Sequence, residues 1–223
     1  MSRSADLGAY RLVVFDWDGT LIDSIGAIVD CTYAMLDELG LPSLPRDEIL
    51  ALIGRGLDES VDALAPEGDE TIRRRIVETY SRLWFADFHA RGQLIAGARR
   101  AVDRLAASGA LLAVATAKSR RGLTSDLERT GVADLFHASR TPNESRPKPH
   151  PDMLLEILEE LGVRPNEALM VGDSVHDLDM ARNAGVPVVA VSSGAQTEAT
   201  LRRRTPLACL GSVAELPEWL GLP

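Results

Sequence analysis

The sequence predicts an α/β fold with a doubly wound parallel sheet and an inserted α-helical domain. Short apolar runs recur at residues 11–15, 110–116, 168–171 and 186–191. Each run is continuous rather than alternating, which is typical of parallel strands that helices cover on both faces. Helical patterns lie between these runs, and strands that alternate with helices favour a parallel sheet with right-handed crossovers. One long stretch, residues 24–91, interrupts the alternation with helical periodicity alone.

The helices between the predicted strands have clear ends. Each apolar pattern of helical spacing stops at a glycine, and glycine directly after the last turn is a common helix stop signal. The patterns cover residues 98–108, 123–130, 151–161 and 174–184.

The interruption predicts a separate helical unit. One helix is expected from Ile25 to Leu39, before Gly40, and another from Ile72 to Trp84. About 70 residues without a strand exceed what an ordinary crossover connection needs, although a pair of crossover helices is the alternative. The prediction is a core of residues 1–22 and 92–223 with a helical cap domain of residues 23–91.

The composition restricts the classes of partner. The 223 residues include 24 basic and 33 acidic side chains, a net charge of −9, which argues against nucleic-acid binding. A locally cationic site can still accept an anionic substrate. No apolar run approaches the ~20 residues that cross a bilayer, and no secretory signal is visible. The distant Cys31 and Cys209 are expected to be free thiols, so we expect a cytoplasmic protein without membrane partners.

The strongest motif is Asp16-Trp17-Asp18-Gly19-Thr20, directly after the first apolar run. Residues i and i+2 of an extended chain point to the same side, so Asp16 and Asp18 are expected to share one crevice at the end of a strand. Two close carboxylates repel unless a cation or a proton relieves them, and an oxygen-liking ion such as Mg²⁺ would do so. Taken alone, Asp-Gly is also a common turn pair.

Further polar residues follow other predicted strands. Asp173 and Asp177 follow the run at 168–171, where Asp173 could complete an Mg²⁺ site and Asp177 could support it; Asp173 could instead cap the next helix. Prolines on both sides hold Lys148 in an extended segment, where its ammonium group could offset phosphoryl charge. Thr116 ends a strand and could donate a hydrogen bond to a phosphoryl oxygen.

These pieces, in this order, resemble the haloacid dehalogenase-like hydrolase superfamily, whose members are mostly phosphatases. The matches are Asp16-x-Asp18-Gly19-Thr20-Leu21, Thr116, Lys148 and Gly172-Asp173-Ser174-x-x-Asp177, and the resemblance covers essentially the whole chain, with its Rossmann-like core and cap. The first and last motifs are specific, and the other two support them. Ala117 departs from the small polar residue that commonly follows the threonine.

The resemblance implies roles for the matching residues. Asp16 would be the nucleophile that forms an aspartyl-phosphate, and Asp18 would act as general acid and then general base. Asp16, the Asp18 backbone carbonyl and Asp173 would bind Mg²⁺, with Asp177 in support. Thr116, Lys148 and the amide near Ala117 would bind the phosphoryl group.

The first motif and the cap also discriminate within the superfamily. Dehalogenases of this fold lack the second aspartate, and phosphonate-cleaving relatives carry a Schiff-base lysine in the cap, whereas residues 24–91 contain no lysine. The segment Gly54-Arg55-Gly56 resembles the cap loop of phosphoglycolate phosphatases, so Arg55 could bind the carboxylate of a small phosphorylated acid. A solvated arginine in a flexible turn is the alternative.

The leading hypothesis is therefore a Mg²⁺-dependent phosphatase of a small phosphorylated metabolite, above all 2-phosphoglycolate. The alternatives are a phosphomutase resembling β-phosphoglucomutase, a broad phosphosugar phosphatase, a pyrophosphatase or, in another class, a binding module resembling response-regulator receivers. The Asp16-x-Asp18 spacing and the cap count against the binding module. The sequence does not decide between a monomer and a homodimer.

Overall fold

The protein is described here by a computed structural model that covers residues 7–222. Its centre is a sheet in which all neighbouring strands are parallel. Across the sheet the order is β5 (Ala138–Arg140), β4 (Leu111–Ala115), β1 (Leu12–Phe15), β6 (Ala168–Gly172), β7 (Val188–Val191) and β8 (Cys209–Leu210). The chain builds the sheet outward from β1 in both directions, so the predicted doubly wound α/β fold is confirmed.

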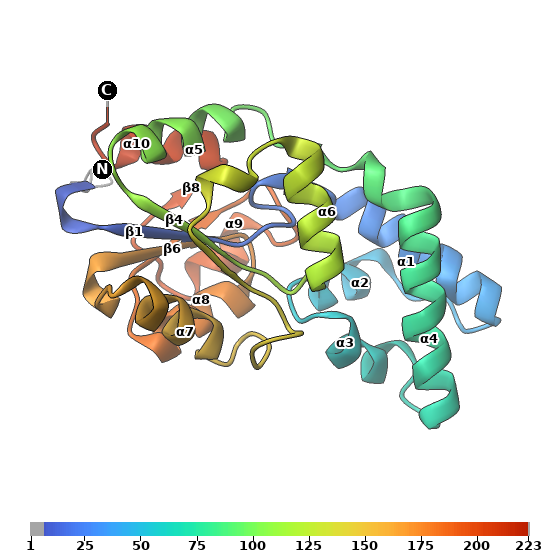
Figure 1. Ribbon diagram of the computed structural model, residues 1–223. Helices are drawn as coiled ribbons and strands as arrows, with labels where there is room; N and C mark the ends of the chain where they lie inside the picture. Colours follow the sequence, from blue (N-terminus) through green and yellow to red (C-terminus); the bar gives the residue numbers. More distant parts are fainter. Residues whose placement is uncertain (1–6, 223) are drawn as a thin grey trace.

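Helices cover both faces of this sheet, and this explains why the strand sequences are apolar throughout (Figure 1). On one face, Val13 and Phe15 of β1 pack with α5 (Ala98–Ala107), α6 (Arg120–Thr130) and α10 (Leu216–Trp219). On the other, Leu12 and Val14 pack with α7 (Asp152–Leu161) and α8 (Val175–Ala184). The short α9 (Glu198–Arg202) packs beside β7. The predicted helices of the core are therefore confirmed.

The two outer strands, β5 and β8, were not expected from the sequence. Each contains three residues or fewer, and Ser139 and Arg140 of β5 carry polar side chains. An edge strand pairs on one side only and needs no long apolar run, so it lacks the pattern that identified the inner strands. The hydrophobic signal thus locates the centre of the sheet and misses its edges.

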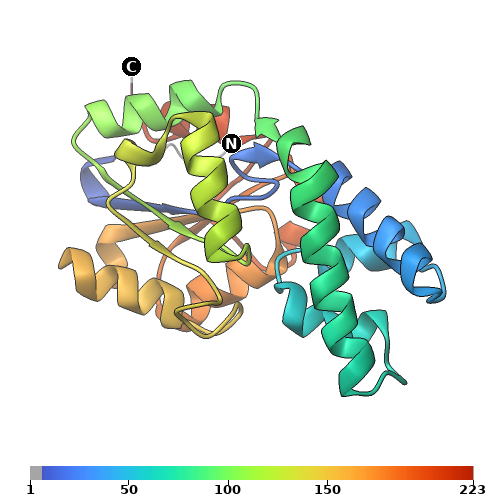
Figure 2. The same cartoon turned by 45° about the vertical axis from the view of Figure 1, so that its right-hand side comes forward.

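The stretch without predicted strands forms a helical insertion, which we define as residues 25–91. It contains α1 (Ile25–Leu39), α2 (Arg46–Leu52), α3 (Leu57–Leu64) and α4 (Glu70–Leu83), and then the turns Trp84–Phe88 and His89–Arg91. The long helices α1 and α4 lie side by side beyond one end of the sheet (Figures 1 and 2). Met35, Leu36 and Ile76 form part of a small core of the insertion's own.

A short antiparallel ribbon joins the insertion to the sheet. Its strands are β2 (Ile22–Asp23) and β3 (Gln93–Leu94), and Ile22 pairs with Leu94 while Asp23 pairs with Gln93. The segments that lead into and out of the insertion therefore run side by side in opposite directions. No helix in the part of the chain that the structure describes has both the length and the apolar character of a membrane span. Cys31 and Cys209 are both free thiols, as the sequence predicted.

Candidate active site

The ends of three neighbouring strands define the candidate site. Asp16 follows β1, Thr116 follows β4 and Asp173 follows β6. Phe15 is in register with Val114 on one side and Val171 on the other, and the Asp16 amide donates to the Val171 carbonyl at 2.9 Å. Since parallel strands end at the same edge, the three polar residues are brought together there, as the sequence predicted.

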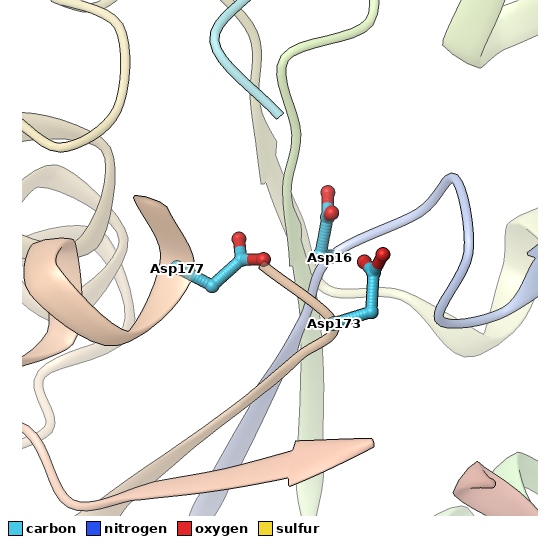
Figure 3. A group of neighbouring side chains, drawn as sticks. All are labelled: Asp16, Asp173 and Asp177. Carbon is cyan, nitrogen blue, oxygen red and sulfur yellow. The ribbon is translucent and has the colours of Figure 1, made fainter. Parts of the chain in front are cut away.

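Three carboxylates meet at this edge. Asp16 and Asp173 project from the strand ends, and Asp177 points toward them from the first turn of α8 (Figure 3). One carboxylate oxygen from each residue lies within 4.8 Å of those of the other two. All three residues are buried, at most 3% exposed. The third member of the trio is therefore the Asp177 carboxylate rather than the Asp18 carboxylate.

Local contacts hold Asp173 and Asp177 in place. The Asp173 carboxylate accepts hydrogen bonds from the Thr20 hydroxyl at 3.1 Å and from the Ala195 amide at 2.8 Å. Asp177 accepts from the backbone and hydroxyl of Ser174 and so closes a capping box at the start of α8. A side chain at Gly19, whose φ is +81°, would collide with the Asp173 carboxylate. The backbone must therefore approach Asp173 closely, which a glycine permits.

One buried lysine faces the carboxylates. The Lys148 Nζ lies 2.8 Å from the Asp16 Oδ1 and 2.6 Å from the Asp177 Oδ1. Lys148 is fully buried in the loop between β5 and α7. Burial alone would lower its pKa, but the two carboxylates outweigh burial and raise the pKa, so the ammonium stays charged. The structure thus places Lys148 beside Asp16, the candidate nucleophile.

The charges of the cluster do not balance. Three carboxylates face one ammonium group, and burial, with the Asp177 charge as the next cause, raises the pKa of Asp16 to about 7. Burial together with the Asp16 charge raises the pKa of Asp173 well above its usual range. A divalent cation would supply the missing positive charge, and buried carboxylate oxygens are the ligands that Mg²⁺ prefers. The residues present therefore fit a divalent metal.

Asp18 lies in the same cavity as Asp16, but its carboxylate has other partners. It accepts a hydrogen bond from the Ser24 hydroxyl at 2.6 Å, and the Lys118 Nζ lies 2.9 Å away. Lys118 also lies 3.4 Å from Asp126, whose carboxylate accepts the indole N–H of Trp17 at 3.0 Å and a hydrogen bond from Arg129 at 2.8 Å. These contacts fix the position of the Asp18 carboxylate at the cavity.

Lys118 is a second lysine at the site, and the sequence motifs assigned it no role. The sequence contains only two lysines, Lys118 and Lys148, against 22 arginines, and both contact carboxylates of the site. Burial opposes the charge of Lys118, but Asp18 and Asp126 raise its pKa. Its ammonium group also lies 4.7 Å from the centre of the Trp84 ring, in the helical insertion. The rarity of lysine in this sequence was the available signal.

Thr116 and Ala117 line the cavity next to Asp16. The Thr116 hydroxyl accepts a hydrogen bond from the Lys118 amide at 3.1 Å, which leaves its own proton available as a donor. Thr116 is buried and Ala117 is half-buried. Both predicted phosphoryl-binding residues are therefore at the strand edge that holds the carboxylates.

Arg55 lies at the border of the site. The loop that carries it reaches the core, because a side chain at Gly54 would meet Ser174 and His176. The Arg55 side chain is exposed, and its Nε donates to the His176 Nε2 at 3.4 Å. Burial lowers the pKa of His176, which favours the neutral imidazole that this contact requires. Arg55 is not among the residues that line the cavity, so its role in binding a carboxylate stays a prediction.

The cavity lies between the strand ends and the helical insertion. Its volume is about 170 Å³. Asp16, Asp18, Thr116 and Ala117 form its floor, and side chains from α1 to α4 and from Trp84–Phe88 form its roof. The arrangement can place a substrate group against Asp16, between the strand ends and the insertion.

Comparisons with known proteins agree with this arrangement. Residues 13–191 match the haloacid dehalogenase-like hydrolase family. The phosphoglycolate phosphatase of Rhodospirillum rubrum is 32% identical, over 96% of this chain and 92% of that protein. The phosphoglycolate phosphatase of Nitrosococcus oceani is 27% identical, over 94% of this chain and 96% of that protein.

A solved structure has the same fold. The crystal structure of a hydrolase from Pseudomonas syringae superimposes with a TM-score of 0.86 at 23% identity, over 95% of this chain and 98% of that one. The overlap includes the sheet and the helical insertion together, since it leaves only a twentieth of the chain unmatched. The order of elements described above is thus an architecture found in solved hydrolases.

Proposed function

Since this chain belongs to the haloacid dehalogenase-like hydrolase family, we propose that it is a Mg²⁺-dependent phosphatase that acts through an aspartyl-phosphate on Asp16. The observation that carries the proposal is the buried trio of Asp16, Asp173 and Asp177 with Lys148 between two of them. A carboxylate in this position can act as a nucleophile only where positive charge surrounds the phosphoryl group.

The metal would be held by the carboxylates of Asp16 and Asp173 and by the Asp18 backbone carbonyl, with Asp177 in support. When bound, Mg²⁺ offsets the negative charge of the phosphoryl group and orients it toward the nucleophile. The raised pKa values of Asp16 and Asp173 support this proposal, because they indicate a site that lacks one cation.

In the first step an Asp16 carboxylate oxygen would attack phosphorus. A bond forms between that oxygen and phosphorus, and the ester bond between phosphorus and the leaving oxygen breaks. The Asp18 carboxyl group would donate its proton to the leaving oxygen. Its contacts with Ser24 and Lys118 keep this carboxyl group on the cavity side of the strand end.

In the second step a water molecule would attack the phosphorus of the aspartyl-phosphate. Asp18, now a carboxylate, takes the proton of that water, and the bond between phosphorus and Asp16 breaks. The products are inorganic phosphate and the original Asp16 carboxylate. Asp18 thereby recovers its proton, so the two steps restore both carboxyl groups.

Lys148 and Thr116 would bind the phosphoryl oxygens throughout. The Lys148 ammonium group is fixed by Asp16 and Asp177 before substrate arrives, so it needs no reorganisation during the reaction. The Thr116 hydroxyl, whose oxygen already accepts the Lys118 amide, can donate its proton to the phosphoryl group. The Ala117 amide would serve as a further donor.

The names of the relatives support 2-phosphoglycolate as the first ester to test. The experiment follows phosphate release from a panel of phosphorylated metabolites with Mg²⁺ and again after chelation with EDTA. We expect release with the metal and its loss on chelation. Release that persists in EDTA would contradict the metal site. Turnover that requires a sugar bisphosphate primer, without net phosphate release, would instead favour the phosphomutase.

A further inference from the structure

We infer that the preferred substrates are phosphate monoesters with an uncharged, largely apolar leaving group of about the size of one ring. The inference rests on the proposed phosphatase activity and concerns the group on the far side of the ester bond. It departs from 2-phosphoglycolate, whose leaving group carries a carboxylate. It rests on the shape of the cavity, on the residues that line it and on the pairing of the charged groups around it.

The position of the cavity indicates which part of the substrate it would hold. Asp16 and Asp18 line the same space as the helices of the insertion. When phosphorus lies at Asp16, the leaving group must therefore extend toward Asp18 and the insertion. The side chains of the insertion that line the cavity thus contact the leaving group rather than the phosphoryl group.

Most of these side chains are apolar. They come from all four helices of the insertion, from the segment between α2 and α3 and from the turn after α4, and they include Ile28, Ile49, Ile53, Leu57, Leu64 and Phe85. Of the hydroxyl residues in the lining other than Thr116 (Thr32, Ser60, Tyr80, Ser81 and Ser119), two are engaged with backbone carbonyls, since Thr32 donates to Ile28 at 2.9 Å and Ser60 donates to Gly56 at 2.7 Å. An apolar leaving group gains from burial here, whereas a polar one loses its hydration.

The cations near the cavity are unsuited to a substrate carboxylate. Lys118 is the only lysine or arginine of the lining within the described residues, and it already lies between Asp18 and Asp126. The Arg55 side chain is exposed and lies against His176. A carboxylate on the leaving group would therefore enter an apolar space next to two aspartates, where Lys118 is already paired and Arg55 does not line the cavity.

The size of the cavity is consistent with one ring. An apolar cavity of roughly 150 Å³ accommodates benzene in a protein interior. The cavity here measures about 170 Å³, a volume that the leaving group shares with the phosphoryl group at Asp16, and apolar residues surround it on the insertion side. A leaving group of one ring or less therefore fits between the strand ends and the insertion.

The test compares benzyl phosphate with 2-phosphoglycolate and glucose 6-phosphate, each with Mg²⁺. Benzyl phosphate is preferable to an aryl phosphate because its leaving group is an alkyl alcohol like those of the other two esters. We expect kcat/KM for benzyl phosphate to exceed both other values at least tenfold. Equal values, or a higher value for 2-phosphoglycolate, would overturn the inference and leave the phosphatase proposal intact. Absence of phosphate release from every ester would overturn both.

Two variants of Ile53 sharpen the test. This residue lies between α2 and α3, outside either helix, so the change does not interrupt a helix. Ile53→Ser should raise the KM for benzyl phosphate about fivefold and leave its kcat nearly unchanged. Ile53→Lys should lower kcat/KM for benzyl phosphate and raise it for 2-phosphoglycolate, because it supplies a cation. Leu155→Ser, at an exposed leucine of α7, is the matched control and should change neither ester. An unchanged ester preference in both Ile53 variants would overturn the inference.

Discussion

The floor and the roof of the cavity are built on opposite principles. The floor concentrates charge: Asp16 and Asp18 line it, and Asp173, Asp177 and Lys148 lie beside Asp16 at the same edge of the sheet. The roof, made by the helical insertion, presents mainly apolar side chains. The floor is fixed by hydrogen bonds and ion pairs between distant parts of the chain, whereas the roof is fixed by packing. We therefore expect changes in the floor to affect every ester alike and changes in the roof to alter the preference among esters.

The substitution Asp16→Asn, in the floor, should lower turnover the most. An amide is not a nucleophile toward phosphorus, so kcat for every ester should fall about 10⁴-fold or more. Single-turnover phosphate release measures this loss. Asp23→Asn, at an exposed aspartate of β2, is the matched control and should retain wild-type kcat. If Asp16→Asn retained wild-type turnover, the nucleophile would lie elsewhere.

The substitution Asp18→Asn should have the next largest effect. Loss of a general acid should lower kcat about 10³-fold for benzyl phosphate. The loss should be much smaller for p-nitrophenyl phosphate in the bond-breaking step, because p-nitrophenolate leaves without a proton. Burst kinetics separate that step from hydrolysis of the intermediate. An equal loss of bond-breaking rate for both esters would contradict the role of Asp18 as a proton donor.

The substitution Lys148→Met should affect stability as well as turnover. It leaves Asp16 and Asp177 without their ammonium partner in a buried site, which should lower the free energy of unfolding by about 3–5 kcal/mol without metal. Turnover should fall about 10²-fold, through lost stabilisation of the phosphoryl group. Urea unfolding with and without Mg²⁺ measures the first effect. An unchanged unfolding free energy would show that Lys148 does not offset the buried charge.

The smallest expected effect is a pH dependence of thermal stability. The pKa of Asp16 is raised from 3.8 to about 7, chiefly by burial, so the folded protein without metal binds this proton more tightly than the unfolded chain. Its contribution to stability is complete below about pH 4 and is lost as the pH rises through about 7. Mg²⁺ binds the deprotonated carboxylates, so it should raise Tm by a few degrees more at pH 8 than at pH 5.5.

Thermal unfolding at the two pH values, with Mg²⁺ and with EDTA, measures this difference. In Asp16→Asn the neutral amide does not titrate, so the dependence should be weaker. A Tm increase by Mg²⁺ that is the same at both pH values would contradict the proposed coupling between the metal and Asp16.

The sequence predicted the floor better than the roof, for a physical reason. Asp16, Thr116 and Asp173 each follow an apolar run, and parallel strands must end at one edge, so their convergence follows from topology. The choice of Asp177 over Asp18 for the carboxylate trio depends on side-chain contacts. Lys118 and Ser24 hold the Asp18 carboxylate, and no spacing rule indicates such partners.

The roof depends on packing that a linear pattern does not specify. Helical periodicity identified α1 and α4, but it does not determine which side chains of α2 and α3 face the floor. Arg55 lies in a glycine-flanked loop without periodicity, so its exposed position against His176 could only be seen in three dimensions. The edge strands β5 and β8 were missed because strands this short carry no distinctive apolar signal.

The ribbon of β2 and β3 has a consequence for how such a molecule can be varied. The chain departs and returns through paired residues, Ile22 with Leu94 and Asp23 with Gln93, and the Ile95 amide donates to the Leu21 carbonyl at 2.9 Å. These hydrogen bonds hold the two ends of the insertion together without contacts from its helices. A foreign segment with suitably spaced ends could therefore be transplanted between Ser24 and Gln93, giving the same reactive residues a new selectivity.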